Sequence, residues 1–117
     1  MIFNLFKKRT KASFLGDENF HEVIAAAPAL VVFTASWCGA CKMQKPLIND
    51  IADAHKDSGI SIAFVDVDTA TKITQEFGIR SMPTLCAFRN GKIIFQHSGV
   101  LGRADLEKII AELKKIS

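Results

Sequence analysis

Two uninterrupted apolar segments, separated by a helical pattern, constrain the fold of this chain more than any other feature. Apolar and polar residues do not alternate strictly in either segment, residues 30–33 (LVVF) or 60–67 (ISIAFVDV). Strict alternation would indicate a strand with one solvent-exposed face. Such runs are typical of strands covered on both sides. Between them, residues 39–55 carry apolar side chains at helical spacing: Met43, Leu47, Ile48, Ile51 and Ala52. The pattern predicts a strand–helix–strand unit with parallel strands.

The segment before the first run predicts a short edge strand followed by a helix. Residues 11–15 form the candidate strand, and Asp17 is the expected N-cap of the helix. Three apolar side chains then share one helical face: Phe20, Val23 and Ile24. Pro28 ends this helix because it cannot donate a backbone hydrogen bond.

After the second run we expect a short helix and then a hairpin. Asp68 or Thr69 is the expected cap of a helix that runs to Phe77. Residues 84–89 and 92–97 are candidate strands, and Asn90-Gly91 between them is a hairpin signal.

A final helix begins near Gly102 and completes the order β-α-β-α-β-α-β-β-α. Its apolar side chains recur at helical spacing: Leu106, Ile109, Ile110, Leu113 and Ile116. Strands that alternate with helices predict an α/β fold with a central mixed, mostly parallel sheet and helices on both faces.

Composition bounds the class of protein. The 117 residues are 49% hydrophobic and 23% charged, which is enough for one hydrophobic core and excludes a disordered chain. Four of the 15 basic residues precede the first acid: Lys7, Lys8, Arg9 and Lys11. The rest of the chain has 11 basic and 12 acidic residues, so its net charge is nearly zero. A nucleic-acid-binding surface, which should be a basic patch on the domain, is therefore not expected. We expect residues 1–10 to be a flexible basic arm and residues 11–117 the folded domain.

The apolar segments are too short to span a membrane. The longest, residues 24–35, contains Pro28, whereas a spanning helix needs about 20 apolar residues. The first residues lack the order of a secretion signal, because their positive charges follow the apolar side chains. A cytoplasmic location and no membrane contact are therefore expected.

A pair of cysteines lies where the first buried strand gives way to a helix. In Trp37-Cys38-Gly39-Ala40-Cys41, Cys38 should meet unpaired backbone N–H groups and the positive end of the helix dipole. Both favour the thiolate, so we expect the pKa of Cys38 to fall below the free value near 8.5. Cys41, one turn later, should be more buried and stay protonated. Gly39 allows a substrate backbone to approach closely.

Two other interpretations of the pair are weaker. Zinc needs four ligands, and the chain offers no second pair: Cys86 stands alone, and His21, His55 and His97 are scattered. No metal is therefore expected. A pair of unreactive core cysteines fits poorly with the adjoining Trp37 and Gly39. Redox chemistry is the favoured interpretation.

Several separated motifs resemble the thioredoxin family, from about Lys11 to Ile116. In chain order they are residues 33–42 (FTASWCGACK), Pro46, residues 65–68 (VDVD), 77–84 (FGIRSMPT) and 88–91 (FRNG), and Gly99. The resemblance implies a thioredoxin fold and protein-disulfide reduction through a Cys38–Cys41 couple. It implies no bound cofactor, regeneration by an NADPH-dependent thioredoxin reductase, and a monomer.

The resemblance also implies a substrate groove beside the couple. Pro83 would be a cis proline packed against the disulfide, which leaves the backbone of Met82 to pair with an extended substrate. Trp37, Gly99 and Val100 would flank the same groove.

The chain departs from the family at positions that matter for the chemistry. Ala40 replaces the usual proline between the cysteines, which changes the restraint on the reduced pair. Val32 and Phe64 stand where the family often has a buried Asp and a Lys, so Cys41 has no obvious internal base. We therefore expect slow or alkaline resolution of the mixed disulfide. Cys86 is expected to be a buried, inert thiol.

Three functions stay open at this point. The first is protein-disulfide reduction, and the second is exchange at a more oxidising potential, as an oxidase or isomerase. The third is a partner-binding module without catalysis. A redox potential separates the first two, and insulin reduction separates both from the third.

Overall fold

The structure is a computed structural model that describes residues 10–115. A five-stranded sheet has the order β1-β3-β2-β4-β5. The strands are β1 (Ser13–Leu15), β2 (Ala29–Thr34), β3 (Ser61–Asp66), β4 (Thr84–Arg89) and β5 (Lys92–Ser98). The helices are α1 (Phe20–Ala26), α2 (Gly39–Ala54), α3 (Thr71–Glu76) and α4 (Arg103–Lys114). The predicted order of elements is confirmed.

The sheet is mixed, as predicted. β3 lies between β1 and β2 and runs parallel to both, whereas β4 is antiparallel to β2 and β5. Asn90 and Gly91, between β4 and β5, have φ values of 55° and 75°. Two successive positive φ values match the tight turn that an Asn-Gly pair favours, so the predicted hairpin is confirmed.

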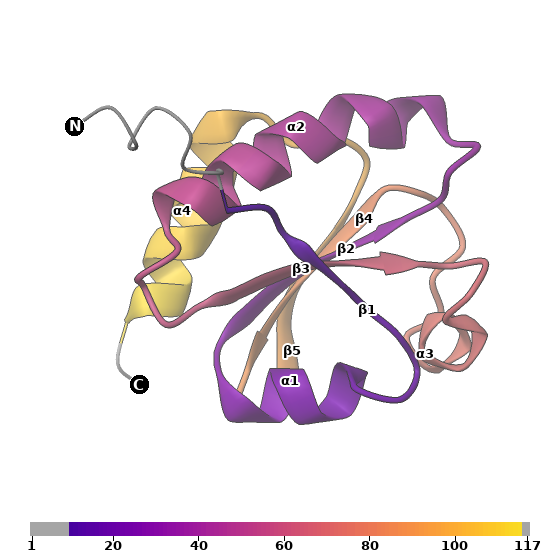
Figure 1. Ribbon diagram of the computed structural model, residues 1–117, viewed down its shortest axis with the longest axis horizontal. Coiled ribbons are helices and arrows are strands. Elements are labelled where there is room, and N and C mark those ends of the chain that lie inside the picture. The colour runs from indigo at the N-terminus through magenta and orange to yellow at the C-terminus, as the bar shows by residue number, and fades with distance from the viewer. Residues whose placement is uncertain (1–9, 116–117) are drawn as a thin grey trace, which may run out of the picture.

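Helices cover both faces of the sheet (Figure 1), with α2 and α4 on one face and α1 and α3 on the other. β2 shows why the first apolar run lacks alternation. Leu30 and Val32 pack into the core beneath α2 and α4, whereas Val31 and Phe33 pack into the core on the side of α1 and α3. Within residues 10–115, no helix is both long enough and apolar enough to cross a membrane.

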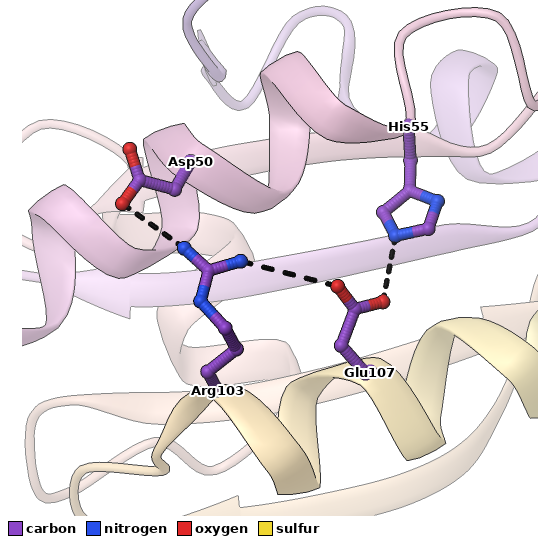
Figure 2. Close-up of polar contacts among 4 residues, drawn as sticks. All are labelled: Asp50, His55, Arg103 and Glu107. Atoms are coloured by element: carbon purple, nitrogen blue, oxygen red, sulfur yellow. Dashed lines mark hydrogen bonds and ion pairs between the residues drawn. The ribbon is translucent and has the colours of Figure 1, made fainter.

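A polar network joins α2 to α4 at the surface (Figure 2). Arg103 donates to Asp50 across 3.1 Å and lies 3.9 Å from Glu107, which also contacts Nε2 of His55 at 2.7 Å. Partly exposed pairs of this kind contribute about 1 kcal/mol or less each. The apolar side chains beneath the network therefore provide most of the packing energy between the two helices.

The predicted helix caps are wrong. The residue before α1 is Asn19, not Asp17, and the residue before α3 is Ala70, so neither Asp68 nor Thr69 caps that helix. Asp17 instead accepts hydrogen bonds from the N–H groups of Ile73 at 2.9 Å and Lys72 at 3.3 Å. The turn after β1 thus supplies the oxygens that the first turn of α3 needs, a contact between residues far apart in the sequence.

The predicted buried face of α2 is wrong at one position. Met43 is 70% exposed, and its neighbour Gln44 is fully buried. Ile48, Ile51 and Ala52 are buried as predicted, and Leu47 is half-buried. A glutamine can be buried when both ends of its amide have partners, which Gln44 finds at Leu101.

The predicted basic arm falls almost wholly outside the described residues, and so does Ile116. Thr10 is described, and its backbone N–H donates to Asp53 on α2 at 2.9 Å. Ala12 donates in the same way to Asn49 at 3.0 Å. These two bonds hold the start of the described chain along α2.

Candidate functional site

The two cysteines sit at the start of α2, four and seven residues after the end of β2. Cys38 is the N-cap residue of the helix, and Cys41 lies in its first turn. Their sulfurs are joined in a disulfide, with the Cα atoms 5.3 Å apart. The backbone N–H of Cys41 donates to Sγ of Cys38 at 3.2 Å. Cys38 is 8% exposed and Cys41 4%, which is the predicted order of burial.

The segment before β4 lies against the leading sulfur. The Met82–Pro83 peptide bond is cis. The carbonyl oxygen of Met82 lies 3.5 Å from Sγ of Cys38. Among residues 10–115, no group bonds to the backbone N–H of Met82. Met82 is half-buried. A backbone donor and acceptor on one stretch are what an added strand uses for pairing.

Trp37 stands next to the disulfide and is 65% exposed. Its indole Nε1–H donates to Oδ2 of Asp68 at 2.8 Å. Asp68 was expected to cap α3, so its contact with Trp37 is a role that the sequence reasoning missed. The bond restricts an aromatic side chain that is otherwise open to solvent.

A short segment after β5 is bonded to two residues near the cysteines in the chain or in space, Pro83 and Gln44. The backbone N–H of Gly99 donates to the carbonyl oxygen of Pro83 at 2.8 Å. Val100 is 38% exposed. Leu101 is held by the side chain of Gln44, whose Oε1 accepts from its N–H at 2.7 Å and whose Nε2 donates to its carbonyl at 3.0 Å. Met82 therefore contacts the disulfide directly, whereas residues 99–101 are linked to its neighbours Pro83 and Gln44.

A pocket of about 280 Å³ opens behind Cys41, and Lys42, Lys45 and Asp66 also line it. Phe64 forms part of its wall and stacks on Phe14, with ring centroids 5.2 Å apart. Nζ of Lys45 lies 5.8 Å from the centroid of the Phe14 ring.

No acid is fully buried near Cys41, and the carboxyl group that lines the same pocket belongs to half-buried Asp66. Val32 and Phe64 are both buried. The buried polar side chains within residues 10–115 are Gln44 and Thr84, neither of which is a base. A proton that leaves Cys41 therefore has the pocket and its solvent as its nearest route out.

The third cysteine lies apart from the pair. Cys86 is fully buried in β4, and burial raises the pKa of its thiol from 9.0 to about 12. His21 pairs with Glu76 and His55 with Glu107. Over residues 10–115, no three or more metal-ligating side chains gather in one place.

Comparison with known proteins points to one family. The sequence model of the Thioredoxin family matches residues 11–112. The chain is 38% identical to a thioredoxin of Alicyclobacillus acidocaldarius, over 85% of this chain and 94% of that protein. It is 34% identical to a bifunctional thioredoxin reductase/thioredoxin of Mycobacterium leprae, over 89% of this chain and 22% of that protein.

Solved structures agree with this match. The crystal structure of a Malassezia sympodialis thioredoxin superposes with a TM-score of 0.82, at 31% identity. The superposition covers 93% of this chain and 96% of that one.

Proposed function

The chain belongs to the thioredoxin family and reduces protein disulfides by thiol–disulfide exchange, and we propose that Cys38 and Cys41 are the exchanging pair. The observation that supports this assignment is the disulfide at the start of α2, with the N–H of Cys41 directed at Sγ of Cys38. Backbone dipoles at a helix start favour negative charge on the leading sulfur.

The first step is attack by Cys38. In the reduced protein its thiolate attacks one sulfur of a substrate disulfide, and a bond forms between Cys38 and that sulfur. The substrate S–S bond breaks, and the other substrate sulfur leaves as a thiolate that takes a proton from solvent. A mixed disulfide results.

The second step is resolution by Cys41. Its thiol gives a proton to solvent in the pocket, and the thiolate attacks Sγ of Cys38. The bond between Cys38 and the substrate breaks as the Cys38–Cys41 disulfide forms, and the second substrate sulfur leaves as a thiolate that takes a proton from solvent. The substrate has gained two electrons, and the protein is left oxidised.

We place the protein substrate in a groove beside the disulfide. Met82 offers its backbone for pairing, and Pro83 holds that segment against Cys38. We place Trp37 and Val100 at its sides, since both expose apolar surface. Gly99, whose N–H donates to Pro83, lies beside them in this proposal. Gly39 and Ala40 keep the approach to Cys38 free of bulky side chains.

The proposal also covers how the Cys38–Cys41 disulfide is reduced again and where the protein acts. An NADPH-dependent thioredoxin reductase restores the dithiol, and the Mycobacterium leprae relative, whose name is bifunctional thioredoxin reductase/thioredoxin, supports this partnership. We further propose a cytoplasmic monomer with no nucleic-acid or membrane partner, organised as a basic arm (residues 1–10) and one domain (residues 11–117).

Insulin-disulfide reduction with dithiothreitol as donor tests the function. The intact protein should turn over, the Cys38→Ser and Cys41→Ser variants should not, and Cys86→Ser should. If the intact protein gave no turnover, the chain would be a binding module instead. A redox potential well above about −270 mV would indicate an oxidase or isomerase.

A further inference from the structure

Residues 99–101, which we call the strap, are bonded at both ends to the surroundings of the disulfide. At one end Gly99 donates to the carbonyl of Pro83, next to the Met82 carbonyl that faces Cys38. At the other end Leu101 is bonded twice to Gln44. Val100 lies between these two points, and no other described residue bonds to its backbone. Its position is therefore set by the two ends.

Gln44 connects the strap to the helix that carries the cysteines. It follows Cys41 by three residues, so the two side chains share one face of α2. Its amide forms both bonds with a single backbone residue, which fixes orientation as well as distance. Since Gln44 is fully buried and Leu101 nearly so, water cannot replace these bonds when the amide is removed.

We infer that Gln44 is a positioning residue for protein substrates: it holds Leu101 so that Val100 flanks the groove at a fixed distance from the Cys38–Cys41 pair. The inference rests on the proposed function. It concerns recognition of an extended polypeptide and leaves the reactivity of the sulfurs unchanged. A small disulfide, which needs no groove, should therefore not depend on Gln44.

The test compares a large and a small disulfide with Gln44→Leu, which keeps the side-chain volume and removes both bonds. With insulin, kcat/KM should fall about tenfold, mostly through KM, because the groove wall is no longer fixed. With the small aromatic disulfide DTNB, both phases of product release, one for attack by Cys38 and one for resolution by Cys41, should stay within about twofold.

Two variants serve as controls. Gln75→Leu makes the same change on the exposed surface of α3 and should alter neither substrate's rate. Leu113→Ala truncates the core in the last turn of α4 and should lower Tm by an amount comparable to that of Gln44→Leu without raising KM for insulin. A similar rise in KM in both destabilised variants would show that Gln44 acts only through stability, and the inference would be wrong.

A double-mutant cycle locates the effect. Val100→Ala should raise KM for insulin in the parent protein and have little further effect beside Gln44→Leu. Additive effects would overturn the inference.

If Gln44→Leu does not fold, Gln44→Glu replaces it. The carboxylate can accept a hydrogen bond from the N–H of Leu101 but cannot donate one to its carbonyl, so a KM for insulin between those of the parent and Gln44→Leu is expected. An unchanged KM for Gln44→Glu would count against the role. A parent protein that reduces neither DTNB nor insulin would refute the proposed function itself.

Discussion

Sγ of Cys38 accepts a hydrogen bond from the backbone N–H of Cys41 at 3.2 Å, so the leading sulfur caps the helix that carries both cysteines. A helix start leaves several N–H groups without intrahelical partners, and a negatively charged sulfur satisfies them better than a neutral thiol does. Reactivity and helix capping therefore use the same atom.

Cys38 should be the acidic thiol of the reduced protein. We expect iodoacetamide to modify Cys38 with a midpoint below pH 8.5, the usual value for free cysteine, because its thiolate is stabilised at the N-cap. Mass spectrometry after alkylation from about pH 4 to about pH 10 measures the midpoint. The same protein unfolded in urea is the control, and an identical midpoint in both states would contradict the expectation.

Val32→Asp should accelerate resolution by Cys41. A carboxylate on β2 supplies the internal base that the buried neighbourhood of Cys41 lacks, so the second phase of DTNB reduction should become faster at neutral pH. Its pH midpoint should move down, and Tm should fall because a charge is buried.

Stopped-flow absorbance follows this phase. Val32→Asn is the control, because asparagine matches aspartate in size but is not a base. It should lower Tm without accelerating the second phase. An identical pH–rate profile for the parent and Val32→Asp would show that resolution is not limited by the missing base.

Cys86 should make stability fall at alkaline pH. Its pKa is about 12 in the folded protein and 9.0 when unperturbed, so above pH 9 the unfolded chain loses a proton that the native state keeps. The stabilising contribution of the raised pKa is complete below pH 9 and is lost as pH rises toward 12.

Urea unfolding of the oxidised protein measures this loss. Relative to Cys86→Ala, which lacks the thiol, the parent's free energy of unfolding should drop by roughly 1 kcal/mol between about pH 8 and about pH 10. A constant difference between the two proteins would show that the thiol titrates normally.

Asp17→Ala should destabilise α3. The substitution removes both acceptors from the N–H groups of Lys72 and Ile73, and loss of a helix cap costs about 1–2 kcal/mol. Urea unfolding gives the free energy, and amide hydrogen exchange should quicken in α3. Asp57→Ala, an exposed site, is the matched control. Equal stability of the two variants would refute the capping role.

The strands and the cysteine pair could be predicted because they depend on neighbouring residues. A run such as residues 30–33 shows by its lack of alternation that both sides are covered, and the helix pattern after Cys38 places the sulfur at a helix start. The contacts of Gln44 and Asp17 could not be predicted. They join residues 57 and 56 positions apart, and nothing in local periodicity indicates such a partner.

The misassigned face of α2 has the same cause. Met43 is the more apolar of two adjacent residues, and hydrophobicity alone favours burying it. The fold instead buries Gln44, because Leu101 offers a backbone donor and acceptor at that point. A distant polar partner outweighs the local preference.

The strap follows the cysteines by some 60 positions along the chain, after β5 and before α4. A fragment that ends before residue 99 therefore keeps both sulfurs and lacks residues 99–101. Such a fragment would lose the ability to discriminate among protein partners even where its sulfurs still react.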